Sequence, residues 1–112
     1  MRKKVLLDGC VPKGLRRSLP DSDVSTAPQM GWGDLDDGPL LAAMSGHFDV
    51  LVTADKGLPK QQRISGRSLA VVILRARTNR IEDLLSLVPD LKHAIEIAKP
   101  GEVHEVAAFS EP

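Results

Sequence analysis

Three aspartates stand at points of the sequence where chemistry could be concentrated. Asp8 directly follows the apolar run 5–7, Asp55 follows the apolar run 50–53 after one residue, and Asp37 begins a stretch of helix-forming residues. Three carboxylates gathered in one place repel one another, and a hard divalent cation such as Mg²⁺ or Mn²⁺ relieves that repulsion. Such an ion activates water and stabilises phosphoryl transition states. We therefore predict that Asp8, Asp37 and Asp55 are metal ligands and catalytic residues of a hydrolase.

Charge is distributed unevenly along the chain. Residues 18–55 contain seven Asp and no Lys or Arg, whereas residues 56–81 contain seven Lys or Arg and no acid. An acidic pocket beside a basic wall suits a metal-dependent nuclease, because the wall neutralises the phosphates of the nucleic acid. The residues predicted to contact nucleic acid are Lys13, Arg16, Arg17, Lys56, Lys60 and Arg63.

Thr53 stands two residues before Asp55, at the end of an apolar run. Its hydroxyl can hydrogen-bond Asp55 or the ion, which would help to orient the site. Threonine is also common in strands because its branched side chain packs well there. Both interpretations stay open. Thr53 is predicted to orient the metal ligands without being one of the three main ligands.

The apolar runs predict the strands that must position these side chains. Residues 5–7, 50–53 and 69–74 are apolar on both faces, which is typical of strands in the interior of a parallel sheet. A weaker strand is predicted at 23–26. Residues 103–107 fit either a late edge strand or a frayed tail.

Three helices are predicted between these strands. The first is short and ends near Pro20. The second begins at Asp37 and is closed by Gly46. From 80 to 98 the apolar residues recur every three or four positions, which predicts one amphipathic helix with a kink near Pro89.

Strands that alternate with helices predict an α/β fold, a three-layer α/β/α sandwich around a small, mostly parallel sheet of about four or five strands. Connections between the parallel strands are expected to be right-handed. Ligands of such sheets bind outside the carboxyl ends of the strands, near the point where the strand order reverses. Asp8 and Asp55 lie at that edge if their strands are neighbours. The helix that begins at Asp37 then aims its amino end at the same place.

Length and composition limit the class of protein. The 112 residues suit one domain, predicted at 1–99, followed by a tail or edge strand at 100–112. Hydrophobic residues make up 42% of the chain and the formal net charge is zero, which favours a folded protein without a global bias towards nucleic acid. The single Cys10 excludes an intrachain disulfide, and no apolar stretch reaches the ~20 residues of a membrane helix. We expect a soluble, cytoplasmic protein without membrane contact.

The segments that carry the aspartates resemble one known family. They are Val5-Leu6-Leu7-Asp8, Met30-Gly31-Trp32, Asp37-Gly38-Pro39-Leu40-Leu41, and the run 50–62, which contains Thr-Ala-Asp-Lys-x-Leu-Pro-x-Gln-Gln after its apolar start. From about residue 4 to about residue 90 the chain resembles the small prokaryotic PIN-like proteins.

The resemblance implies a fold, an activity and partners. It implies a PIN-like sandwich and a Mg²⁺-dependent ribonuclease, the toxin of a toxin–antitoxin pair. RNA would be the substrate, a cognate antitoxin protein the partner, and a homodimer the assembly. It also implies the metal-site role of Asp8, Asp37 and Asp55.

Two departures from the PIN-like pattern leave an alternative open. The family usually has an acidic residue after Asp8, where this chain has Gly9, and many relatives have an acid or Asn where this chain has Gly57. Fewer carboxylates would hold an ion more weakly. The alternative is therefore a catalytically degenerate PIN-like module that binds RNA or a protein without turnover.

A further alternative is a cysteine-dependent phosphatase. Cys10 and Arg16 have the Cys-x5-Arg spacing of those enzymes. Pro12 speaks against it, because a phosphate-binding loop offers successive backbone N–H groups and proline has none. Cys10 is instead interpreted as a small buried residue.

Overall fold

A five-stranded sheet organises the chain, which is described by a computed structural model over residues 2–78 and 80–107. Every strand pairing is parallel, and the strand order is β2-β1-β3-β4-β5. The strands are β1 (Lys4–Leu7), β2 (Asp23–Thr26), β3 (Val50–Thr53), β4 (Ala70–Arg75) and β5 (Val103–Ala107). The predicted α/β class is confirmed, and residues 103–107 form an edge strand. Residues 108–112 of the predicted tail lie outside the described residues.

Helical segments connect these strands. They are the 3-10 helix η1 (Lys13–Ser18) and the α-helices α1 (Asp37–Met44), α2 (Leu58–Gln61), α3 (Ile81–Leu85) and α4 (Val88–Ile97). The single helix predicted over 80–98 is wrong, because the chain is divided at Ser86 and Leu87 into α3 and α4. Pro89 lies in the first turn of α4, where it starts a helix instead of kinking one. Over the described residues, no helix is long and apolar enough to span a membrane.

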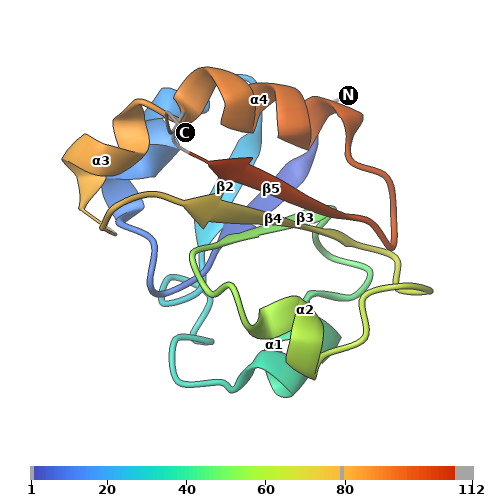
Figure 1. Cartoon of the computed structure of the whole chain (residues 1–112). Coiled ribbons are helices and arrows are strands. Elements are labelled where there is room, and N and C mark those ends of the chain that lie inside the picture. The colour runs from blue at the N-terminus through green and yellow to red at the C-terminus, as the bar shows by residue number, and fades with distance from the viewer. Residues whose placement is uncertain (1, 79, 108–112) are drawn as a thin grey trace.

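Helices cover both faces of the sheet, which gives the chain three layers (Figure 1). On one face lie η1, α3 and α4, and Leu15 of η1 and Leu91 of α4 belong to the same apolar core. On the other face lie α1 and α2, whose Leu41 and Leu58 belong to a second core. Alternate residues of each strand enter one core or the other, because successive side chains of a strand point to opposite faces.

The connection from β4 to β5 has the opposite hand to the other three. The chain moves across the sheet in the same direction from β3 to β4 and from β4 to β5. However, α2 packs on one face while α3 and α4 pack on the other. The prediction that all crossovers share one hand is therefore wrong for the last connection, which contains two helices and is long enough to pass over either face.

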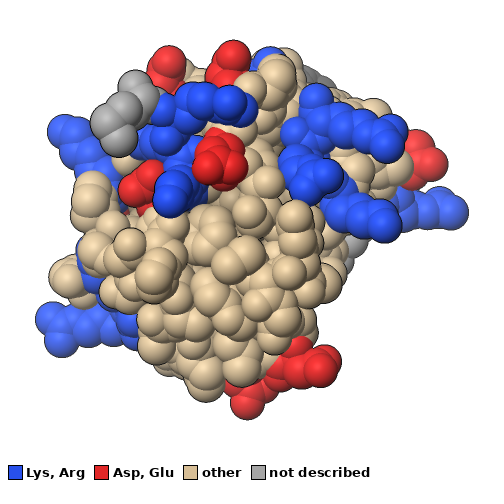
Figure 2. Space-filling model, turned by 180° about the vertical axis from the view of Figure 1, so that it is seen from behind, with Lys and Arg blue, Asp and Glu red and all other residues tan. Residues whose placement is uncertain are grey.

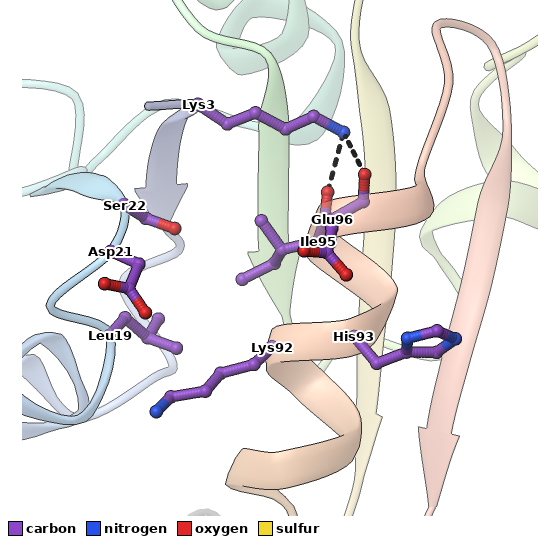
Figure 3. A pocket seen from close by; sticks show the side chains of 8 residues that line it. All are labelled: Lys3, Leu19, Asp21, Ser22, Lys92, His93, Ile95 and Glu96. Atoms are coloured by element: carbon purple, nitrogen blue, oxygen red, sulfur yellow. Dashed lines mark hydrogen bonds between the residues drawn. The ribbon is translucent and has the colours of Figure 1, made fainter. Parts of the chain in front are cut away.

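Lys3 closes the amino edge of the sheet (Figure 3). Its ammonium group donates to the carbonyl oxygens of Ile95 at 2.7 Å, Glu96 at 3.1 Å and Ala98 at 2.7 Å. Carbonyls at the end of a helix lack partners within the helix, so a cation stabilises them. The contact ties the start of β1 to the end of α4, 92 residues further along the chain. A cavity of about 510 Å³ lies beside it, between α4 and residues 19–22.

Candidate metal centre

Asp8 lies at the carboxyl end of β1, next to β3. β1 and β3 are paired, and the backbone N–H of Asp8 donates to the carbonyl oxygen of Val52 at 2.9 Å. The first and third strands are therefore neighbours, which is the condition that places Asp8 and Asp55 at the same edge. These strands flank the point where the strand order reverses, because β2 lies on one side of β1 and all later strands lie on the other. Ligands bind at this point in sheets of this kind.

Thr53 links Asp8 to Asp55. Its hydroxyl donates to Oδ2 of Asp8 at 2.7 Å and accepts from the N–H of Asp55 at 3.1 Å. Thr53 is fully buried, so its hydroxyl is held in place by the strand and by these two partners. Oδ1 of Asp8 accepts from the N–H of Gly9 at 2.7 Å, and Oδ1 of Asp55 accepts from the N–H of Gly57 at 2.9 Å. Backbone and hydroxyl donors therefore orient both carboxylates.

Helix α1 brings a third carboxyl group to this edge. Asp37 is the first residue of α1, and its side chain is half-buried. Burial raises the pKa of the Asp37 carboxyl above its ordinary value, and contact with the charged carboxyl of Asp55 raises it further. The charges of Asp8 and Asp36 add smaller increases. The carboxyl groups of Asp55 and Asp8 are therefore close enough for their charges to act on Asp37.

This crowding predicts that Asp37→Asn stabilises the metal-free protein at pH 7. Because the pKa of Asp37 is raised on folding, the folded protein binds the proton more tightly, and wild-type stability falls as the pH rises through that pKa. Asparagine has no charge to repel Asp55, so the Tm of the variant should exceed that of the wild type. The difference should shrink as the pH falls through the raised pKa of Asp37, because the wild-type carboxyl then becomes protonated and uncharged. Thermal unfolding in EDTA at a series of pH values measures the Tm of the wild type and of the variant.

Asp21→Asn, at the amino edge, is the matched control for this experiment and should show no gain in Tm that depends on pH. A lower Tm for Asp37→Asn at pH 7 would mean that the Asp37 carboxylate stabilises the fold.

The carboxylates do not converge on one point as they stand. Across residues 2–78 and 80–107, no group of three or more His, Cys, Asp or Glu side chains is arranged to hold a metal ion. Asp8 and Asp37 line two separate hollows, of about 520 Å³ and about 380 Å³. The first also includes the loop 28–34, and the second includes Gln61 and Gln62 of the α2 segment. A cation shared by all three aspartates therefore requires their side chains to rotate.

Two further acidic residues border the site and were not singled out from the sequence. The charge of Asp36 contributes to the raised pKa of Asp37, and Asp34 lines the hollow that contains Asp8. Their place in the acidic segment 18–55 was the available signal. Sequence position alone does not tell which aspartates of that segment face the carboxyl edge.

Cys10 is exposed, so its interpretation as a buried residue is wrong. It lies in the turn beyond β1, not in the strand, and its Sγ is 3.6 Å from Oγ1 of Thr53. Arg16, the arginine of the Cys-x5-Arg spacing, donates from its guanidinium to Oε1 of Gln29 at 3.4 Å. The structure therefore gives the cysteine phosphatase no support.

The basic residues predicted to contact nucleic acid lie in two groups. One group is on η1 and the other is in or beside α2, which cover opposite faces of the sheet. All six side chains are exposed. The groups are Lys13, Arg16 and Arg17 on η1, and Lys56, Lys60 and Arg63 at α2. The basic wall predicted from the linear sequence is therefore divided between the two faces.

Comparisons with known proteins give no relative for this chain, so the centre is described from its own residues. No family model matches the sequence, and neither a curated protein nor a solved structure matches the chain. Within the centre, burial and the charges of Asp55 and Asp8 raise the pKa of Asp37, and Thr53 connects Asp8 to Asp55. An oxygen-only donor set of this kind suits a hard cation such as Mg²⁺ or Mn²⁺.

Proposed function

We propose that this protein is a Mg²⁺- or Mn²⁺-dependent endoribonuclease of the PIN-like type. The observation that supports the proposal most strongly is the placement of Asp8 and Asp55 at the switch point of the sheet, where the hydroxyl of Thr53 joins them. Burial, together with the charges of Asp55 and Asp8, raises the pKa of Asp37 beside them. A divalent cation neutralises repulsion among carboxylates. The motif resemblance to PIN-like proteins then favours RNA as the substrate.

The residues that would hold the cation are Asp8, Asp37 and Asp55. When bound, the ion supplies Lewis acidity and a water of lowered pKa for the hydrolysis of a phosphodiester. The chain itself contributes the negative charge that attracts the ion. Thr53 contributes the fixed orientation of Asp8, because its hydroxyl donates to that carboxylate.

The biological setting of the proposal follows from the resemblance alone. In that setting the protein is a cytoplasmic toxin of a toxin–antitoxin pair. It forms a homodimer, and a cognate antitoxin protein binds it and blocks access of RNA to the aspartates.

Two measurements on the wild-type protein test the activity. Calorimetric titration of Mn²⁺ into EDTA-treated protein should show binding, and a labelled single-stranded RNA should be cut in Mn²⁺ or Mg²⁺ but not in EDTA. Cleavage that persists in EDTA would exclude the proposed chemistry. Absence of both Mn²⁺ binding and cleavage would exclude the proposed site.

Thr53→Val is expected to weaken Mn²⁺ binding. Valine keeps the shape of threonine but removes the hydroxyl that orients Asp8 and accepts from Asp55. Groups that orient metal ligands contribute about 10- to 100-fold in affinity, so we expect the Kd to rise about tenfold. Titration calorimetry measures the change, and Thr53→Ser, which retains the hydroxyl, is the control. Equal affinity of Thr53→Val and the wild type would show that the hydroxyl does not serve the ion.

A binding module without turnover is the second candidate, and Gly9 favours it. The residue follows Asp8 directly and contributes no carboxylate, so the ion would be held by fewer charges. Such a module binds RNA or a partner protein and shows no cleavage at any metal concentration.

Gly9→Glu is expected to tighten Mn²⁺ binding. A Cβ atom added at Gly9 has one neighbour within 4 Å, the carbonyl oxygen of Gly33 at 4.0 Å, so a side chain fits. One more carboxylate beside Asp8 should lower the Kd about tenfold, since affinity for hard cations follows the charge of the ligands. Gly9→Gln adds the same bulk without charge and is the control. Cleavage gained by Gly9→Glu from an inactive wild type would identify the chain as a degenerate nuclease.

A further inference from the structure

Two segments that are far apart in the sequence lie side by side at the carboxyl edge of the sheet. A Cβ atom on Gly14 of η1 would lie 3.9 Å from Cδ1 of Ile81, the first residue of α3. Leu15 of η1 and Leu84 of α3 belong to the same apolar core. Because η1 follows β1 and α3 follows β4, both segments begin at the edge where Asp8 lies.

Six exposed basic side chains lie on η1 or between the end of β4 and the start of α3, and together they are called the basic ridge: Lys13, Arg16, Arg17, Arg75, Arg77 and Arg80. Arg75 forms an ion pair with Glu105 at 2.9 Å. Within the described part of the chain, the other five ridge residues have no ion-pair partner. Asp83 of α3 is occupied by the hydroxyl of Thr78, which donates to it at 2.6 Å. The ridge therefore carries a local excess of positive charge.

Basic side chains gather in groups on the surface of the molecule. Figure 2, which views the chain from behind, shows Lys and Arg side chains in separate groups on the upper part of this face, with Asp and Glu side chains beside some of them, above a broad uncharged area. In a chain whose formal net charge is zero, such groups are local features. Their positive charge attracts a negatively charged ligand that comes close to this part of the surface.

We propose that the basic ridge binds the phosphates of an RNA strand and leads the strand to the aspartates, an inference that rests on the proposed function. Five of the six ridge residues are arginines, whose planar guanidinium groups match the geometry of phosphate oxygens in a bidentate manner. The ridge begins just after Asp8 in the chain and on the same edge of the sheet. A strand held on η1 and on the loop before α3 therefore lies next to the candidate metal centre.

The basic group at α2 is not the main phosphate surface. Lys56 directly follows Asp55, and the α2 segment shares a hollow with Asp36 and Asp37. Its positive charges are therefore offset by neighbouring carboxylates. The ridge residues of η1, which include Arg16 and Arg17, lie with η1 on the opposite face, away from α1 and α2.

Fluorescence anisotropy of a labelled single-stranded RNA of about 16 nucleotides tests the inference. The full chain is used in EDTA, so that binding is separated from cleavage. Arg77→Gln with Arg80→Gln, and Lys13→Gln with Arg17→Gln, should each weaken binding about tenfold. Each pair should also reduce the slope of log K against log salt by about 1.4, because each phosphate contact to a single strand contributes about 0.7.

Control pairs decide the location of the surface. Lys92→Gln with Lys99→Gln, near the amino edge, and Lys56→Gln with Lys60→Gln, at α2, should leave the Kd within about twofold of the wild type. Ridge variants that bind as tightly as these controls, or loss of binding in the α2 pair alone, would overturn the inference. Displacement of the RNA by polyglutamate as effective as that by unlabelled RNA would also overturn it, by assigning the ridge to acidic proteins.

This experiment tests the basic ridge independently of the proposed nuclease activity. Weak binding by the ridge variants supports the ridge even if the wild type cuts no RNA. Cleavage by the wild type together with unchanged binding by the ridge variants supports the nuclease and rejects the ridge.

Discussion

Asp8→Asn and Asp55→Asn are each expected to reduce Mn²⁺-dependent RNA cleavage at least about a hundredfold. An amide keeps one oxygen, which can still accept from Thr53 at position 8 and from the N–H of Gly57 at position 55. The fold should therefore survive while the negative charge that would hold the cation is lost. Single-turnover cleavage rates at saturating protein measure the effect.

Asp21→Asn is the control for these two variants, because Asp21 lines the cavity at the amino edge, away from the candidate centre. It should cleave RNA at the wild-type rate. If Asp8→Asn and Asp55→Asn retain that rate with an unchanged Tm, the reaction takes place without these aspartates and the proposed site is wrong.

Leu51→Ala is expected to cause a large loss of stability. Leu51 is fully buried in β3, the central strand of the sheet, and belongs to the apolar core beneath α1 and α2. Its truncation leaves a cavity in a close-packed interior, which costs about 3 kcal/mol in the free energy of unfolding. Urea denaturation followed by circular dichroism measures the change.

Leu85→Ala makes the same chemical change on α3, where the side chain is 47% exposed. Its cost should stay below about 1 kcal/mol. Equal losses for the two variants would mean that the core on the α1 side does not stabilise the sheet.

The strands could be predicted from sequence because their residues are unusually uniform. The runs 5–7, 50–53 and 69–74 are apolar except for Thr53, and the sheet buries them on both faces. The helices were harder to predict. α2 is a single turn that begins with Leu58-Pro59 and is too short for an apolar period to show. The break between α3 and α4 keeps the three- and four-residue spacing of apolar side chains, so the pattern alone predicts one helix.

The sequence predicted that Asp8, Asp37 and Asp55 lie at the candidate centre, because their placement follows from the order of strands and helices. Neighbouring first and third strands place Asp8 near Asp55, and a helix that starts at Asp37 brings the third carboxyl group to the same edge. The roles of individual atoms could not be predicted, because they depend on side-chain rotamers. Thr53 is one example, since its sequence position does not reveal that one hydroxyl serves two aspartates. The division of the basic residues between two faces likewise depends on which face each connection crosses.

A nascent chain leaves the ribosome with its amino end first, so Lys3 emerges long before the helix whose carbonyl oxygens it binds. The ammonium group reaches those oxygens only after Ala98 has been synthesised and released from the exit tunnel. β1, β2 and β3 can pair well before then, because their residues come earlier in the chain. The hydrogen bonds between Lys3 and the end of α4 therefore form late in biosynthesis. Until α4 docks on the sheet, the apolar face that it covers is accessible to chaperones.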